Sequence, residues 1–191
     1  MNQLKEQNKL RNNLENAAYP SVMQRAGAYL LDIVIIFPIM GVWFFASKKL
    51  NTNLYSGIII QIFNCFLLNF YRIIFNAKFN GTPGKHIFKF KIISESGMPI
   101  AWNAAIKREL ISITVSIIYL ISFYTAFFMN LEDITSYEKA NSIYISSGFS
   151  KINTIAMWII YIFDFGKANS SPKRQTLHDK IAKTVVVFKY A

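Results

Sequence analysis

Four long apolar stretches limit this chain to a small number of possible folds. They cover residues 28–46, 56–75, 110–129 and 149–165. About 20 residues, at ~1.5 Å of helical rise each, are enough to cross the hydrocarbon core of a bilayer. The fourth stretch is shorter and more polar than the other three. The pattern predicts an all-α membrane protein with four transmembrane helices, folded as one membrane domain over residues 1–191.

The composition agrees with a membrane protein. Charged residues make up only 16% of the chain, whereas they make up roughly a quarter of a typical soluble protein. The net charge is +11, which we attribute to the positive-inside bias of membrane proteins, so we expect no nucleic-acid partner. Cys65 is the only cysteine, and with two histidines it provides too few ligands for a convincing metal site. We therefore expect no metal and no cofactor.

Lysine and arginine are distributed unevenly along the chain, and their distribution predicts an orientation. Four precede the first stretch, six lie in residues 76–109 and six in residues 166–191, against two near each of the other connections. Such an alternation requires an even number of spans, with the basic segments in the cytoplasm. We expect both termini, the segment 76–109 and the tail 166–191 on the cytoplasmic side of a bacterial cytoplasmic membrane.

The segment 76–109 carries a short strand pattern. Phe88, Phe90 and Ile92 alternate with Lys89 and Lys91, so the apolar and basic side chains fall on opposite faces. Each lysine near an anionic headgroup surface contributes about 1 kcal/mol of attraction. We expect Lys89 and Lys91 to face anionic lipid headgroups.

Turn signals flank this strand pattern. Ser94–Gly97 is a turn signal, and Met98–Trp102 is a candidate return strand, which predicts a small cytoplasmic β-hairpin between the second and third helices. Thr184–Phe188 is a β-branched run that is a candidate further strand. Before the hairpin, Gly81-Thr82-Pro83-Gly84-Lys85 lacks the spacing of a phosphate-binding loop, and we interpret it as a tight turn.

Three ionisable residues lie within the apolar stretches, where an unpaired charge costs at least ~2.5–3.5 kcal/mol. They are Asp32, Arg72 and Asp164, all near the expected cytoplasmic ends. Asp32 lies two helical turns from Arg25, so the two share a helix face. We expect Asp32 to point into the bundle, paired with Arg25 or Arg72; its alternative is a purely structural ion pair. Arg72 can also reach the surface by itself, and for Asp164 we favour simple headgroup exposure.

Three motifs resemble those of the RDD family of bacterial membrane proteins. The first is Arg25-Ala-Gly-Ala-Tyr-Leu-Leu-Asp32, with an arginine seven residues before an aspartate. The second is the segment from Gly81, Thr82, Gly84 and Lys85 to Ser96-Gly97, and the third contains His178-Asp179 and Thr184-Val-Val. The resemblance implies that Arg25, Asp32 and Asp179 are the arginine and two aspartates of the family name. It also implies a transport function, with cation–proton exchange suggested for some members.

Two functions remain open from the sequence. The first is a small transporter or exchanger of cations, protons or another small solute, in which Asp32 binds the ion and a homodimer encloses the path. The second is a scaffold or accessory subunit whose basic cytoplasmic face docks a protein partner or anionic lipid. No serine–histidine–acid set, zinc motif or carboxylate pair indicates an enzyme, so we expect no catalytic residues.

Overall fold

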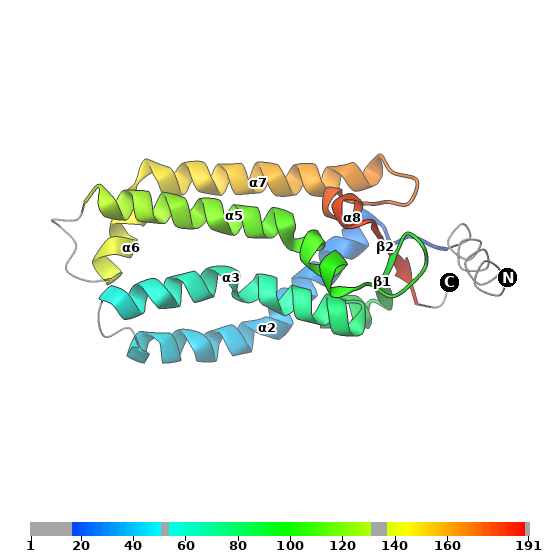
Figure 1. Ribbon diagram of the computed structural model, residues 1–191, viewed down its shortest axis with the longest axis horizontal. Helices are drawn as coiled ribbons and strands as arrows, with labels where there is room; N and C mark the ends of the chain where they lie inside the picture. The colour runs from blue at the N-terminus through cyan, green and yellow to red at the C-terminus, as the bar shows by residue number, and fades with distance from the viewer. Residues whose placement is uncertain (1–16, 51–53, 131–136, 190–191) are drawn as a thin grey trace. The chain divides into compact units, whose positions relative to one another are not determined.

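The computed structural model describes residues 17–50, 54–130 and 137–189. In chain order, its elements (Figure 1) are α2 (Val22–Leu50), α3 (Leu54–Phe79), α4 (Pro83–Ile87), β1 (Phe90–Ser94), α5 (Trp102–Phe128), α6 (Tyr137–Ser146), α7 (Gly148–Asn169), α8 (Leu177–Ala182) and β2 (Thr184–Phe188). The described residues form two compact units. Unit 1 contains 17–36, 71–110 and 163–189, and unit 2 contains 37–50, 54–70, 111–130 and 137–162.

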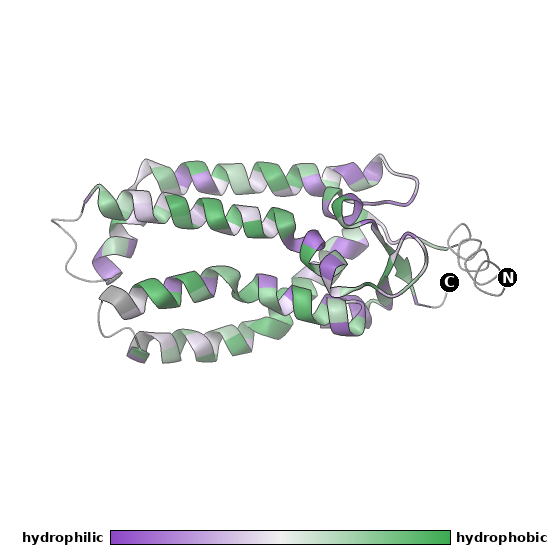
Figure 2. Ribbon diagram, in the orientation of Figure 1, coloured by the Kyte–Doolittle hydropathy of each residue, from purple (hydrophilic) through white to green (hydrophobic). Residues whose placement is uncertain are grey.

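Among the described residues, three helical segments are long and apolar enough to cross a membrane. They are Val22–Ser47, Ser56–Phe79 and Trp102–Phe128, with 26, 24 and 27 residues. Figure 2 shows the long hydrophobic stretches on α2, α3 and α5. The first three predicted spans are therefore confirmed as long apolar helices. The fourth corresponds to α7, a helix of 22 residues that carries Lys151, Asp164 and Lys167 and is not one of these three segments.

The small sheet of unit 1 is not the predicted hairpin. β1 pairs antiparallel with β2, in a register that places Phe90 opposite Phe188 and Ser94 opposite Thr184. The candidate return strand Met98–Trp102 is wrong, because it makes only one isolated bridge, between Ile93 and Pro99. Pro99 lacks the N–H that a ladder requires, and Trp102 already begins α5. The candidate strand Thr184–Phe188 is confirmed.

The two strands are covered on both faces. Phe90, Ile92 and Val186 pack with Ala28 of α2 and Ala105 of α5. On the other face, Val185 and Val187 pack with Ala17 and Tyr19. Burial on both faces explains why β2 is a continuous β-branched run rather than an alternating one.

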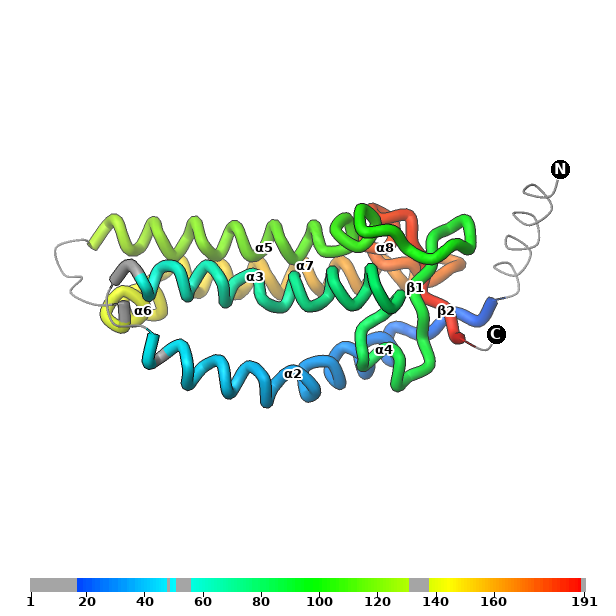
Figure 3. Tube along the Cα trace, turned by 60° about the horizontal axis from the view of Figure 1, so that its bottom comes forward, coloured from blue at the N-terminus to red at the C-terminus, as the bar shows by residue number. Residues whose placement is uncertain are grey.

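The predicted face of the first strand holds for Phe90 and Ile92, which are fully buried, but not for Phe88. Lys89 has a φ of 60°, a left-handed conformation that interrupts the alternation just before β1 begins. Phe88 therefore lies outside the strand, in the turn after α4. Figure 3 shows the short helix α4 and the strand β1 that follows it. Lys89 is exposed, and Lys91 is half-buried.

Unit 2 holds its helices together with uncharged groups. Phe123, Ala126 and Phe127 of α5 pack with Ala140 and Tyr144 of α6. Hydrogen bonds also join helices of this unit. For example, Gln61 donates to the Tyr119 hydroxyl, Asn69 donates to the Ser116 hydroxyl at 3.0 Å, and Trp43 donates to Asn64 at 2.5 Å. Amides and hydroxyls of this kind connect helices without introducing charge into an apolar environment.

Candidate functional site

The first part of the candidate site is Asp32, a residue that is 7% exposed and binds the N-terminus of α4. Gly84 N donates to Asp32 Oδ1 at 2.7 Å, and Thr82 Oγ1 donates to Oδ2 at 2.5 Å. The Tyr71 hydroxyl also donates to Oδ1, at 3.4 Å. Thr82 occupies the N-cap position of α4, but its hydroxyl makes no local capping bond. The carboxylate of Asp32 therefore serves as the cap of α4 from another helix, where a negative charge is favourable.

Gly84 is required by the close approach of α4 to α2. A Cβ at this position would lie 2.3 Å from the carbonyl oxygen of Ala28 and 2.8 Å from Asp32 Oδ1. Neither the backbone oxygen nor the engaged carboxylate can move without displacing an element. The glycine of the predicted turn is therefore a contact residue between α4 and α2.

Lys85 follows directly and is linked to Asp32 through Thr82. Its Nζ donates to Thr82 Oγ1 at 3.3 Å, so the same hydroxyl accepts from Lys85 and donates to Asp32. Burial of the amine, together with repulsion from Arg108, lowers the pKa of Lys85 to about 8, although Asp32 and Glu109 act in the opposite direction. The side chain keeps some exposed surface. Lys85 is thus a basic group whose pKa of about 8 lies well below that of an ordinary lysine.

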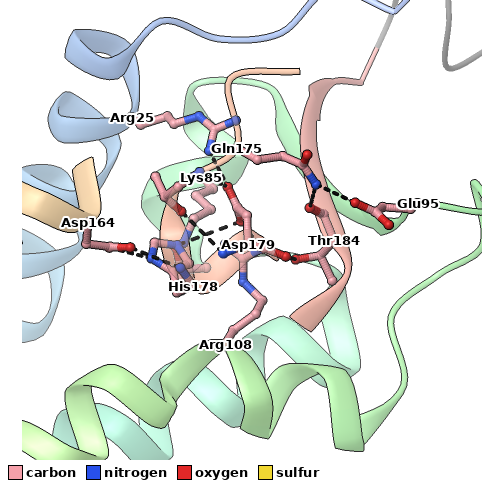
Figure 4. A network of polar contacts seen from close by, with 11 residues as sticks. Arg25, Lys85, Glu95, Arg108, Asp164, Gln175, His178, Asp179 and Thr184 are labelled. Atoms are coloured by element: carbon pink, nitrogen blue, oxygen red, sulfur yellow. Dashed lines mark hydrogen bonds and ion pairs between the residues drawn. The ribbon is translucent and has the colours of Figure 1, made fainter. Parts of the chain in front are cut away.

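The second part of the site is Asp179, which is fully buried in α8. Asp179 and Thr176 form a capping box: Asp179 N donates to Thr176 Oγ1, and Thr176 N donates to Asp179 Oδ2. Arg25 Nη1 donates to Oδ2 at 2.6 Å, and Arg108 Nη1 donates to Oδ1 and also to Thr184 Oγ1. Figure 4 shows both guanidinium groups converging on this carboxylate.

Two arginines on one carboxylate decide its charge. Burial alone would raise the pKa of Asp179, but the charges of Arg108, His178 and Arg25 outweigh it and hold the pKa well below its ordinary value. Each carboxylate oxygen of Asp179 is hydrogen-bonded, as a stable buried ion pair requires on its acidic side. Asp179 is therefore ionised throughout the neutral range.

The third part is Asp164, which is 3% exposed near the end of α7. It accepts from His178 N at 3.0 Å and contacts His178 Nδ1 at 2.6 Å. The Nε2 of the same ring lies 3.8 Å from Asp179 Oδ1. The expected headgroup exposure of Asp164 is therefore wrong. The first turn of α8 supplies it with a backbone and a ring partner, which the sequence of a single helix could not reveal.

The two arginines expected to pair with Asp32 pair with other carboxylates instead. Arg25 pairs with Asp179, whereas Arg72 lies 3.5 Å from Glu109 Oε2 and 4.5 Å from the ring centre of Tyr29. Asp32 instead accepts from neutral donors, with the charge of Lys85 close to it. Arg25 and Asp32 share a helix, as expected, but each holds a different motif.

Four members of the site were missed from the sequence. They are Tyr71, Arg108, Glu109 and Thr176. Arg108 and Glu109 fall in the predicted connecting segment, although a charged pair next to a long apolar run is a signal that it belongs to the helix. Thr176 precedes Asp179 by three residues, which is a capping-box spacing. Thr184 was part of a motif, but nothing in the sequence showed that its hydroxyl accepts from Arg108.

Gly81, the other glycine of the predicted Gly81–Lys85 turn, lies at the edge of this network. Gly81 is buried just before Thr82, and a Cβ there would meet only ordinary van der Waals contacts. The adjoining Gln175 side-chain nitrogen donates to Glu95 at 2.7 Å and to the Thr184 carbonyl at 2.9 Å. Among residues 17–50, 54–130 and 137–189, no group of three or more His, Cys, Asp or Glu side chains is arranged to hold a metal ion.

The charges of the network balance. It contains four basic side chains and four carboxylates, which are Arg25, Arg72, Lys85, Arg108, Asp32, Glu109, Asp164 and Asp179. In addition, His178 is an ionisable group in contact with two of the aspartates. The net charge of the network therefore changes when Lys85 gains or loses a proton near pH 8.

The three motifs meet in this network, and comparison with known proteins shows the family to which the chain belongs. No curated protein and no solved structure matches the chain. The model of the RDD family matches residues 19–183, which include all the charged residues of the network and end one residue before Thr184. With Arg25 joined to Asp179 and Asp32 joined to the Gly81–Lys85 segment, this chain belongs to the RDD family of membrane proteins.

Proposed function

We propose that this membrane protein exchanges a small cation or another small solute for protons, with the Asp32–Thr82–Lys85 chain as the proton-carrying part. The observation that carries the proposal is the shared hydroxyl of Thr82. It connects a carboxylate at 2.5 Å to an amine at 3.3 Å, in the buried part of unit 1. Ionisable groups next to membrane-crossing helices are costly to maintain and commonly mark ion or proton pathways.

Proton uptake by this chain would act on α4. Ionised Asp32 holds Gly84 N and the Thr82 hydroxyl with charge-assisted hydrogen bonds, which are roughly twice as strong as neutral ones. A protonated Asp32 would lose that strength and its attraction for the N-terminus of α4. Binding a cation at the carboxylate and holding α4 would then compete, which couples the ion to the proton.

The proposal includes a topology. We propose that α7 is the fourth span, since its 22 residues extend roughly 33 Å at ~1.5 Å each. Both termini then lie in the cytoplasm, which agrees with the uneven distribution of lysine and arginine. We further propose a bacterial cytoplasmic membrane and a homodimer, because four helices per chain are few to enclose a path.

The test is ion flux in sealed proteoliposomes containing the full chain. Proton flux driven by a sodium or potassium gradient is measured for the wild type, Asp32→Asn and Lys85→Met. We expect flux from the wild type and at least a tenfold loss in both variants, which corresponds to about 1.4 kcal/mol of barrier. We also expect the wild-type rate to change around pH 8, where Lys85 titrates.

Glu138→Gln is the matched control, because Glu138 is an exposed acid in α6 of unit 2. Its flux should equal that of the wild type. Full flux from a folded Asp32→Asn protein would sink the assignment to Asp32. No flux from any variant, in vesicles shown to hold a gradient, would refute the exchange function.

A second function has an observation of its own. Most exposed ionisable side chains around the sheet are basic, and they include Lys89, Lys180, Lys183 and Lys189. A non-transporting scaffold would use this face to dock a protein partner or anionic lipid. It predicts that changing Lys89 and Lys91 to glutamine abolishes function, while Asp32→Asn only lowers the amount of folded protein.

A further inference from the structure

Arg25 uses only one end of its guanidinium group. Nη1 donates to Asp179 Oδ2 at 2.6 Å, whereas Nε and Nη2 are buried and have no hydrogen-bond partner among the residues that the structure describes. The side chain is 7% exposed. Buried donors without a partner are rare, and each requires an explanation such as a water or an ion.

The two unpartnered nitrogens form one edge. In a guanidinium group, the N–H bonds of Nε and Nη2 point the same way and are spaced to match two oxygens of one carboxylate or phosphate. A single water accepts only part of such an edge, whereas an oxyanion fills it with two parallel charge-assisted bonds. The geometry of this edge therefore favours an anion over a water molecule.

The charges near Arg25 also favour an anion. One carboxylate, Asp179, attracts Arg25, while the charges of Arg108 and Arg174 repel it. Arg174 is exposed and donates Nη1 to the carbonyl oxygen of Tyr19 at 3.3 Å, six residues before Arg25 in the chain. Although the network as a whole is balanced, the charges that act on Arg25 are therefore more positive than negative.

The position of Arg25 indicates where the anion comes from. It is the fourth residue of Val22–Ser47, a segment long and apolar enough to cross a membrane, so it lies within about 6 Å of the start of that segment. This depth corresponds to the boundary between hydrocarbon and headgroups. A phosphate at this boundary belongs either to a phospholipid headgroup or to a soluble phosphate compound.

We propose that the Nε–Nη2 edge of Arg25, together with Arg174, binds a phosphate group of a lipid headgroup or of a small solute. This site is separate from the Asp32–Thr82–Lys85 chain and does not depend on transport. The edge is closed to solvent in this structure, so binding requires the groups that cover the edge to move aside while Arg174 stays beside the phosphate. Filling the edge removes two unsatisfied donors and stabilises the folded chain.

The test uses the full chain in a neutral detergent, with two sources of phosphate. Inorganic phosphate is titrated at constant ionic strength against chloride while the melting temperature is followed. Phosphatidylglycerol retained on the protein is counted by native mass spectrometry against phosphatidylcholine. The variants are Arg25→Lys, which keeps the charge without the two-pronged edge, and Arg174→Gln, with Lys180→Gln as an exposed-charge control.

We expect a saturable rise in melting temperature or retained phosphatidylglycerol in the wild type and in Lys180→Gln. Arg25→Lys and Arg174→Gln should weaken that binding at least about tenfold. A response to inorganic phosphate identifies a soluble ligand, and one to phosphatidylglycerol alone identifies a lipid. No response to either, or an equal response in wild type, Arg25→Lys and Arg174→Gln, would overturn the proposal. If Arg25→Lys does not fold, Arg174→Gln and the wild-type titration still decide it.

Discussion

The two units of the molecule bury different kinds of polar groups. Every buried aspartate, glutamate or arginine among the described residues belongs to unit 1, and these are Arg25, Asp32, Arg108, Glu109, Asp164 and Asp179. The buried polar residues of unit 2 are Ser47, Gln61 and Asn69. Unit 1 also contains both strands and the short helices α4 and α8, whereas unit 2 consists of long helices and α6.

The difference shows what a buried charge requires. In a long helix within an apolar environment, the backbone N–H and C=O groups bond to one another, so only side chains can bind a buried charge. Short helices expose N–H groups at their N-termini. In unit 1, the backbone N–H groups of Gly84, Thr176 and His178 donate hydrogen bonds to carboxylates. Charges are therefore gathered where the chain supplies free backbone donors.

The largest expected effect comes from removing the carboxylate that two arginines share. Asp179→Asn leaves Arg25 and Arg108 buried without a counter-charge, and breaking a buried ion pair in this way costs about 3–5 kcal/mol. The free energy of unfolding in mixed micelles measures the loss. Glu138→Gln, an exposed change in unit 2, should stay within about 0.5 kcal/mol of wild type. Equal stability of Asp179→Asn and wild type would show that the network contributes nothing to unit 1.

A smaller and pH-dependent effect is expected at Lys85. Its folded-state pKa of about 8 lies below the ordinary value of 10.5, so between these values the unfolded chain binds the proton and the folded chain does not. Stability therefore increases as the pH rises from about 8 to 10.5, and the burial penalty is fully present below pH 8.

The free energy of unfolding changes by at most about 3 kcal/mol over this pH range. The change should be smaller than this limit because the Lys85 side chain is partly exposed. The readout is the difference in unfolding free energy between wild type and Lys85→Met, measured at several pH values, since other lysines titrate equally in both. A difference that is flat from about pH 7 to 10.5 would contradict the assignment.

Alanine substitutions at two glycines allow the packing of the two units to be compared directly. Gly84→Ala in unit 1 forces a Cβ against the Ala28 carbonyl and Asp32, and overpacking of this kind costs typically about 1–3 kcal/mol. Gly41→Ala in unit 2 meets nothing within 4 Å, and it should stabilise the helix by about 0.5–1 kcal/mol. Melting temperatures of the two variants should move in opposite directions. If both melting temperatures shifted in the same direction, the close approach of α4 to α2 would not explain the effect of Gly84→Ala.

The smallest effect is expected for a neutral hydrogen bond of unit 2. Gln61→Leu removes the bond to Tyr119, and such bonds between membrane helices contribute on average about 0.6 kcal/mol. The unfolding free energy should fall by that amount, far less than for Asp179→Asn. A loss as large as that of Asp179→Asn would mean that neutral and charged networks contribute alike.

The apolar helices and the motif residues could be predicted from the order of amino acids alone. Length and hydrophobicity are properties of single segments, so the predicted spans fall within α2, α3 and α5, apart from residues at their ends. The alternation at Phe90 and Ile92 and the β-branched run of β2 were equally local signals. Asp32 stood out because a charge within an apolar run is costly, wherever its partners lie.

The pairing of the charges, in contrast, depends on how distant segments pack. Arg25 and Asp179 are 154 residues apart in the chain, and Asp32 is 50 residues from Thr82. Spacing along one helix specifies a shared face but says nothing about which element packs against it. The strand partner of β1 was settled in the same way, because Pro99 cannot complete a ladder and β2 can. Hydrophobic length is encoded locally, whereas buried charges find their partners only when the chain has folded.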